Sequence, residues 1–291
     1  MDRITFIQHL VAKFVLWSLA HSPPALAQFY ARLLDVAVSR LRRTARRNLE
    51  LAYPEKSADE RDAITDEVFR SIARLLYAFA QFPRLNRENI SNWIRYEGLE
   101  NYLEAKKAGR GILIATAHFG NWELSAFAHA LMTEPMHIMI RPLDNPAIDR
   151  IVEERRTLSG NRHIAKRDSA RAVLRALQQN EAVGILIDQN TSLEEGVFVN
   201  FFGKQASANV AFAKIAARTG AAVIPGFAVW SEKEKRYVLR FYPPVPMSGD
   251  AAQDTQRLHS LLEEVIREHP GQWLWIHRRW KTRPPSEPPL Y

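Results

Sequence analysis

The feature that most constrains this fold is the alternation of short apolar runs with helical patterns from residue 101 onward. Runs typical of buried strands occupy residues 111–117, 136–140, 183–187 and 223–229. Helical patterns lie among them at residues 121–132, 146–158, 169–179 and 209–219. This alternation predicts an α/β fold with a central, mostly parallel sheet flanked by helices. Residues 237–242 add a plausible strand and residues 254–269 a late helix, and ligands are expected at the carboxyl ends of the strands.

The N-terminal segment has a different pattern. Apolar residues recur at helical spacing over residues 4–20, and a second helix is expected to begin near Pro24. Residues 14–31 carry no charge, but Pro23 and Pro24 interrupt the run, which favours helices that lie on a membrane over a helix that spans it.

A cluster of arginines follows these two helices, at positions 40, 42, 43, 46 and 47. Such a run suits an anionic bilayer surface, although a solvated helix face is the alternative. We therefore divide the chain into residues 1–47, membrane-associated helices with a basic run, and residues 48–291, an α/β domain. Within the second part, Ser57 and Glu60 form a capping box that predicts a helix, which ends at Phe82-Pro83.

Charge and composition narrow the class of protein. The chain has 40 Lys and Arg against 32 Asp and Glu, a net charge of +8, which favours nucleic acid, anionic lipid or an acidic carrier protein as partner. It has no cysteine, so disulfides, thiolate metal sites and cysteine nucleophiles are excluded. No Gly-x-Ser-x-Gly, Walker A or His-Glu-x-x-His motif is present, and we expect no metal site.

The segment GILIATAHFGNWELSAF contains the strongest catalytic candidate. A buried strand ends at His118, and Glu123 follows on the first turn of the next helix. Gly120 allows a sharp bend that can bring the carboxylate back to the imidazole. A carboxylate on one ring nitrogen leaves the other free to take a proton from a hydroxyl, so the pair is predicted to be a general-base dyad. The alternative is a glutamate placed by the helix dipole alone.

At this point the sequence resembles a known family. The segments NLELAYPEKS, HFGNWE, RPLDNP and WLWIHRRWK, which extend over nearly the whole chain, are similar to the lysophospholipid acyltransferase superfamily and, within it, to the lipid A biosynthesis lauroyl and myristoyl acyltransferases. The resemblance implies that His118 and Glu123 are catalytic and that Arg156 is an essential arginine. It also implies an acyl carrier protein thioester as co-substrate, no other cofactor, and a place on the cytoplasmic face of the inner membrane.

Other polar residues could bind substrate. Arg141 directly follows a strand, and a guanidinium there or at Arg156 could hold a phosphate or a developing oxyanion. Asp188 and Gln189 end another strand at the same sheet edge. Lys166 and Arg167 could add phosphate contacts, with an exposed loop as the alternative.

Two further segments bear on partners and specificity. The closing block, residues 273–281, mixes tryptophans with cations, which suits an interfacial belt or a carrier-protein dock, although packing is favoured for Trp275. After Phe201-Phe202-Gly203 the chain has Ala206-Ser207-Ala208-Asn209 where many members of the family have threonines. This departure leaves acceptor and chain-length specificity open.

We therefore expect an acyltransferase that moves a fatty acyl chain from acyl carrier protein, or from CoA, to a hydroxyl of a lipid A precursor. Acylation of another glycolipid, such as a phosphatidylinositol mannoside, or of a lysophospholipid is the alternative. A basic protein that binds membrane or nucleic acid without catalysis would also explain the charge, but it leaves the His118–Glu123 spacing unused. We expect the partners to be the carrier protein, a glycolipid acceptor and the anionic membrane surface, and no nucleic acid.

Overall fold

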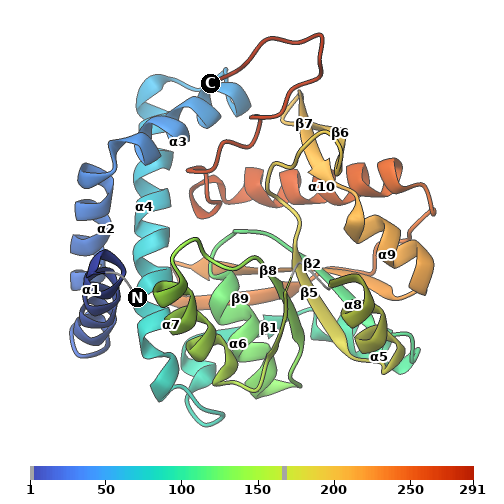
Figure 1. The fold of residues 1–291 in the computed structure, drawn as a ribbon, viewed down its shortest axis with the longest axis horizontal. Helices are drawn as coiled ribbons and strands as arrows, with labels where there is room; N and C mark the ends of the chain where they lie inside the picture. The colour runs from blue at the N-terminus through green and yellow to red at the C-terminus, as the bar shows by residue number, and fades with distance from the viewer. Residues whose placement is uncertain (1–2, 166–168) are drawn as a thin grey trace.

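The structure, a computed structural model, describes residues 3–165 and 169–291. Its centre is a seven-stranded sheet with the order β1-β9-β8-β2-β5-β3-β4 (Figure 1). The strands are β1 (Ile94–Glu97), β2 (Ile112–Thr116), β3 (His137–Ile140), β4 (Arg162–Ala165), β5 (Ala182–Leu186), β8 (Ala222–Ser231) and β9 (Arg236–Phe241). All neighbouring pairs are parallel except β8 and β9, which are antiparallel. The predicted α/β fold with a mostly parallel sheet is confirmed.

Alternate residues of β2 enter different parts of the core, as the two-residue period of a strand requires. Ile112 and Ile114 pack on one face of the sheet with α4, α5 and α6, whereas Leu113 and Ala115 pack on the other face with α8, α9 and α10. These helices are α4 (Ala58–Gln81), α5 (Leu99–Lys107), α6 (Trp122–Met132), α8 (Ser169–Gln178), α9 (Ala211–Thr219) and α10 (Ala251–Glu268). A further helix, α7 (Pro146–Thr157), connects β3 to β4.

Three helices precede α4 and lie beside it: α1 (Arg3–Ala20), α2 (Ala25–Ala37) and α3 (Ser39–Ala52). Both α1 and α2 pack on α4, and Leu19, Ala27 and Ala31 belong to the same apolar cluster as the core of the sheet. The predicted capping box at Ser57 and Glu60 is present at the start of α4. The proposed boundary between residues 47 and 48 lies inside α3.

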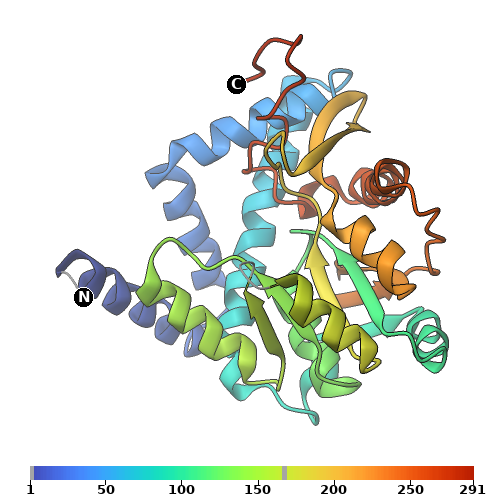
Figure 2. The same cartoon turned by 45° about the vertical axis from the view of Figure 1, so that its right-hand side comes forward.

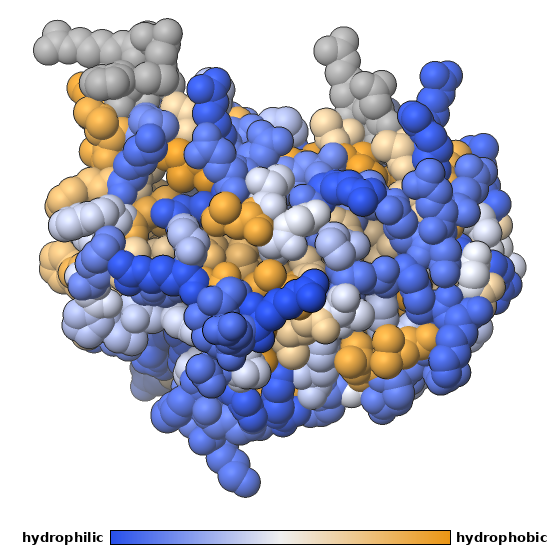
Figure 3. Space-filling model, turned by 90° about the horizontal axis from the view of Figure 1, so that it is seen from below, coloured by the Kyte–Doolittle hydropathy of each residue, from blue (hydrophilic) through white to orange (hydrophobic). Residues whose placement is uncertain are grey.

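The N-terminal helices leave a large apolar surface exposed. Side chains that are more than half exposed include Val11, Phe14, Trp17, Phe29, Leu33 and Val36. Apolar atoms gather along the left edge of the molecule in Figure 3, the side on which α1 lies. Across residues 3–165 and 169–291, no helix combines the length and the apolar character needed to cross a bilayer. The association of this segment with a membrane therefore stays a prediction.

The predicted basic run divides into two groups on α3. Arg42 bonds Asp35 and Asp66, Arg46 bonds Asp62, and Arg47 bonds Glu50 and the carbonyl oxygen of Leu290. Arg40 and Arg43 are exposed, and their side chains make no hydrogen bond or ion pair within the described part of the chain. Two arginines, rather than five, are thus free to contact an anionic surface.

Two features next to the sheet were not predicted from the apolar runs. A two-stranded antiparallel hairpin, β6 (Gly196–Phe201) and β7 (Lys204–Asn209), extends from the sheet and packs on α10 (Figure 2). The tryptophan-rich C-terminal segment returns between this hairpin and α3. Buried Asn48 of α3 anchors it through hydrogen bonds from Nδ2 to the carbonyl oxygens of Trp275 and His277.

Candidate active site

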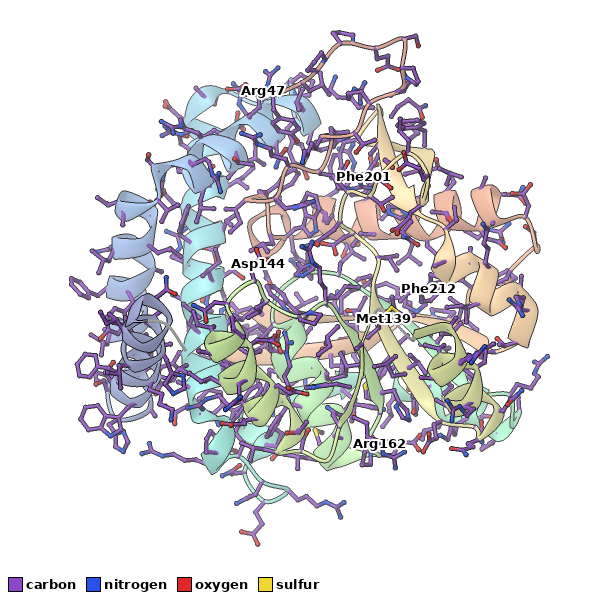
Figure 4. All side chains as sticks on the ribbon, viewed as in Figure 1. Arg47, Met139, Asp144, Arg162, Phe201 and Phe212 are labelled. Carbon is purple, nitrogen blue, oxygen red and sulfur yellow. The ribbon has the colours of Figure 1, made fainter. Side chains whose placement is uncertain are left out.

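Two adjacent parallel strands deliver the central residues of the site to one edge of the sheet. Thr116 of β2 is paired with Leu186 of β5, and His118 and Asp188 each follow two residues later. The same edge carries Asp144 after β3, whereas Arg162 marks the opposite edge, where β4 begins (Figure 4). The carboxyl ends of the strands thus bring His118 and Asp188 together, as the topology predicts.

The His118 ring is oriented by Asp188. His118 Nδ1 lies 2.9 Å from Asp188 Oδ1, and the backbone N–H of His118 donates to Asp188 Oδ2 at 3.1 Å. An ionised carboxylate can only accept hydrogen bonds, so Nδ1 carries the proton and donates it. This tautomer leaves Nε2 as the acceptor, with the amide Nε2 of Gln189 3.5 Å away.

The electrostatics of the pair favour an ionised carboxylate and a basic imidazole. Burial lowers the pKa of His118, but the charge and hydrogen bond of Asp188, together with the charge of Glu123, outweigh burial and raise this pKa above its usual value. Burial raises the pKa of Asp188, but the His118 charge and the hydrogen bonds from His118 and Trp273 outweigh it and hold this pKa at about 2. A buried, ionised Asp188 is suited to stabilise an imidazolium.

Glu123 is held by an arginine. Its carboxylate accepts two hydrogen bonds from Arg156, through Nε at 2.7 Å and through Nη2, and a third from Trp122 Nε1 at 3.0 Å. The Glu123 and Arg156 side chains are 11% and 19% exposed, so the pair is largely shielded from water. The expectation that the imidazole donates to Glu123 is therefore corrected: Nδ1 of His118 donates to Asp188, whereas Glu123, on the first turn of α6, accepts from Arg156 on α7. Glu123 still acts on His118 through its charge.

The bend between His118 and α6 depends on Gly120. Its φ is +56°, and a Cβ at this position would lie 1.8 Å from the carbonyl oxygen of Ala228. The peptide N–H of Gly120 donates to the carbonyl of Gln272 at 2.7 Å, and that of Asn121 donates to Ala228 at 3.2 Å. Asn121 Oδ1 then caps α6 by accepting from the N–H of Leu124. The predicted glycine bend is confirmed.

The remaining predicted residues lie in different surroundings. Arg141, in the loop after β3, is 82% exposed and has Asp144 as its ion-pair partner at 3.7 Å. Gln189 is exposed beside the His118 ring. The predictions for Lys166 and Arg167 lie outside the described residues. The structure thus gathers His118, Glu123, Arg156, Asp188 and Gln189, and it leaves Arg141 at the rim of this edge.

Arg155, next to Arg156 on α7, has a different contact. Its Nη1 donates to the carbonyl oxygens of Phe79 and Ala80 at the end of α4, at 3.2 and 3.1 Å. These carbonyls belong to the last turn of a helix, where few backbone donors remain, and that of Phe79 also accepts from the backbone N–H of Phe82. Arg155 therefore ties α7 to α4, whereas Arg156 faces Glu123.

The closing tryptophans pack inside the protein. Trp273, Trp275 and Trp280 are at most 2% exposed, so the packing interpretation, favoured for Trp275 from sequence, applies to all three. The indole N–H of Trp273 also donates to Asp188 Oδ2 at 2.9 Å. This contact with the site was not predicted, because no sequence pattern states which buried tryptophan reaches which strand end.

The described residues offer no group of three or more His, Asp or Glu side chains that could hold a metal ion. A small apolar hollow beside the site is lined by Ile72, Leu75, Trp122 and Leu274, among others, and it has room for about 10 Å³. A larger cavity of about 200 Å³ lies away from His118, between α2 and α4, and its lining includes Arg32, Asp35 and Arg42. The lining of neither hollow includes His118.

The fold and the site together define an α/β enzyme in which a carboxylate-oriented histidine at the edge of the sheet can deprotonate an acceptor group. Residues 3–282 match the family described as bacterial lipid A biosynthesis acyltransferase. The chain belongs to this family and is an acyltransferase.

Individual relatives are similar over nearly their whole length. The lipid A biosynthesis palmitoleoyltransferase of Escherichia coli K12 is 31% identical over 285 residues, which cover 95% of this chain and 92% of that protein. The lauroyltransferase of the same organism is 30% identical over 284 residues, with the same coverage. Its myristoyltransferase is 26% identical over 275 residues, which cover 92% of this chain and 85% of that protein.

Proposed function

We propose that this enzyme transfers a fatty acyl chain from an acyl carrier protein thioester to a hydroxyl group of a lipid A precursor. The observation that carries the proposal is the partly buried His118 ring, whose Nδ1 is bonded to buried Asp188, which leaves Nε2 as the acceptor. Support for the acceptor comes from the family and from the names of the similar proteins.

In this mechanism, Nε2 of His118 takes the proton of the acceptor hydroxyl while the oxygen attacks the thioester carbonyl carbon. The new C–O bond forms, the C–S bond breaks, and the imidazolium returns its proton to the departing thiolate. Asp188 stabilises the imidazolium between these two proton transfers. Base catalysis of this kind contributes roughly 10²–10⁴-fold.

We propose that Glu123 and Arg156 act as a unit in the same reaction. The bidentate bond leaves other N–H donors of the Arg156 guanidinium free for a phosphate or a developing oxyanion, and Glu123 keeps the guanidinium in place. The Glu123 charge also stabilises protonated His118. Glu123 thus retains the catalytic role expected for it, although it acts through its charge and through Arg156.

We further propose that the enzyme works on the cytoplasmic face of the inner membrane, with α1 and α2 in the interface. The exposed apolar side chains of these helices suit insertion at the level of the headgroups, and the free cations Arg40 and Arg43 suit anionic lipids. The net charge of +8 also suits an acidic carrier protein.

Purified enzyme tests the reaction directly. Acyl carrier protein and CoA thioesters are each supplied with a lipid A precursor, a phosphatidylinositol mannoside or a lysophospholipid, and products are identified by mass spectrometry. We expect carrier-dependent acylation of the lipid A precursor. Acylation confined to one of the other acceptors would replace the proposed substrate, and preference for CoA would replace the proposed donor.

A further inference from the structure

Asp188 can orient His118 only if Asp188 is itself held in place by another group. The carboxylate accepts three hydrogen bonds, and two of them come from His118, through Nδ1 and the backbone N–H. The third comes from Trp273 Nε1 at 2.9 Å. Among the described residues, the indole N–H is therefore the donor that holds the Asp188 carboxylate without belonging to His118, the residue that Asp188 orients.

Trp273 is well placed for such a role because its own position is rigid. Residues 272–274 lie along residues 118–120, with Leu274 N bonded to His118 O at 2.9 Å and Gly120 N bonded to Gln272 O at 2.7 Å. The indole is 2% exposed and makes edge contacts with the rings of Phe201 and Trp275, with centroids 5.7 and 4.6 Å away. The direction of its N–H is thus set by backbone pairing and by ring packing.

The neighbouring tryptophans provide a contrast. Trp275 Nε1 donates to the carbonyl oxygen of Pro270 at 2.7 Å, and Trp280 Nε1 is buried without a partner among the described residues. All three indoles belong to the same packed segment, but one of them reaches the catalytic carboxylate. The bond to Asp188 is therefore not a general consequence of burying a tryptophan there.

We propose that Trp273 is a positioning residue for acyl transfer, whose indole N–H fixes the Asp188 carboxylate and through it the His118 ring. This inference rests on the proposed role of His118 as the base. Without the N–H, Asp188 can rotate, its bond to Nδ1 weakens, and His118 loses both its orientation and part of the stabilisation of its protonated form.

Several other charged or titratable groups surround the pair. Glu123, Arg156 and His277 act on His118, and His277, Arg279 and His259 act on Asp188. A change from tryptophan to phenylalanine alters none of these charges. A shift in the titration of His118 therefore reports the geometry of its bond to Asp188.

The test compares Trp273→Phe with Trp275→Phe and Trp280→Phe, the same change at two other buried positions of the segment. We expect Trp273→Phe to lower kcat by about tenfold with KM within about twofold, since one hydrogen bond to a charged group is lost. Both control variants should stay within about twofold of the unmodified enzyme. Equal losses in all three variants would show that Trp273 supports packing alone and would overturn the proposal.

A second measurement does not depend on turnover. Titration of the His118 ring by NMR, in enzyme with labelled histidine, should give a lower pKa in Trp273→Phe than in unmodified enzyme and no change in the two controls. An unchanged or raised His118 pKa would overturn the positioning role. If the unmodified enzyme transfers no acyl group from any donor, the proposed function fails. The titration still decides whether Trp273 positions Asp188 and His118.

Replacement of Trp273 by benzothienylalanine covers the case in which the phenylalanine variant does not fold. This side chain keeps the size of the indole and has sulfur in place of the N–H. We expect the same loss of kcat and the same fall in the pKa of His118. Full activity in this variant would exclude the N–H as the positioning group.

Discussion

In the proposed mechanism, Asp188 determines which nitrogen of His118 is free to act as a base. Asp188→Asn keeps the shape of the side chain but removes the charge that stabilises the imidazolium. We expect kcat to fall by roughly 10²–10⁴-fold, the range typical of base catalysis. Asp59→Asn, the same change at an exposed position on the first turn of α4, should leave kcat within about twofold. A near-normal rate for Asp188→Asn in folded protein would contradict the assignment.

The effect of Asp188 on His118 also predicts how the rate of acyl transfer depends on pH. The pKa of His118 is raised, so the ring becomes protonated and inactive as a base at a higher pH than an ordinary histidine would. The rate should therefore rise with pH, with a midpoint above the usual value of about 6.5. In Asp188→Asn the charge of Asp188 no longer raises the pKa of His118. Burial, which lowers this pKa, is then opposed only by the weaker effect of the Glu123 charge, so the midpoint should move to lower pH. A pH–rate profile of kcat/KM for both enzymes measures this shift, and a midpoint that stays in place would argue against His118 as the titrating base.

The two neighbouring arginines of α7 should respond differently to removal. Arg156→Ala leaves the shielded Glu123 carboxylate without its partner at the site, so kcat/KM should fall on the order of 10²-fold. Arg155→Ala removes the side-chain donor of two helix-end carbonyls, so it should lower the free energy of unfolding by about 1–3 kcal/mol with most activity kept. Arg150→Ala, at an exposed position of α7, serves as the control. Equal, small effects of Arg155→Ala and Arg156→Ala on turnover would mean that Arg156 has no part in the site.

The sequence predicted which residues belong to the site better than it predicted the hydrogen bonds between them. Strand ends and a glycine bend placed His118, Glu123 and Asp188 at one edge, because these signals are local. The partner of the imidazole depends on the register of β2 against β5, residues about 70 positions apart, and no local pattern encodes that register. The result is that Asp188, predicted as a substrate-binding residue, makes the hydrogen bond that had been assigned to Glu123.

At the scale of elements, long apolar runs predicted the inner strands and the outer strands were missed. β1 and β4 are the two edge strands, with four residues each, so they need fewer apolar side chains than a strand covered on both faces. The β6–β7 hairpin did carry a signal, since Val197, Val199 and Phe201 alternate before a turn at Phe202-Gly203 with positive φ at both residues. A hairpin outside the main sheet is not part of the β–α alternation that guided the analysis.

Two glycines with similar, positive φ angles differ in the space around them. A comparison of the two therefore separates the cost of backbone strain from the cost of steric overlap. Gly120 has φ +56° and no room for a Cβ, whereas Gly203 has φ +71° and nothing within 4 Å of the added atom. Gly203→Ala should therefore lose roughly 1–2 kcal/mol of stability, the cost of a left-handed conformation for alanine. Gly120→Ala must also move α6 away from Ala228, so it should lose considerably more and shift His118. Chemical denaturation of both variants measures the difference, and equal losses would mean that the bend can relax without cost.

At the scale of the whole molecule, the N-terminal helices have one face in the core and one face in solvent. Leu19, Ala27 and Ala31 pack with α4 and the sheet, so deletion of residues 1–47 would open the core and also cut α3. Truncation would therefore confuse loss of membrane contact with loss of the fold. Substitutions on the exposed face test membrane contact without this problem.

We expect the quadruple change of Phe14, Trp17, Phe29 and Leu33 to serine to release the enzyme from membranes while it stays folded. These side chains are 53–60% exposed, so about half of each remains to be buried in an interface. Full burial of a large apolar side chain stabilises by about 1.5–3 kcal/mol, so the four changes together remove roughly 3–6 kcal/mol of binding, on the order of a hundredfold or more in partitioning.

Leu103→Ser with Leu193→Ser, at exposed apolar positions far from α1 and α2 in the sequence, is the control. Flotation with vesicles that contain anionic lipid measures binding, and circular dichroism checks the fold. Undiminished flotation of the quadruple variant would contradict α1 and α2 as the membrane-binding surface, because a loss of this size would have to appear if these four side chains enter the interface.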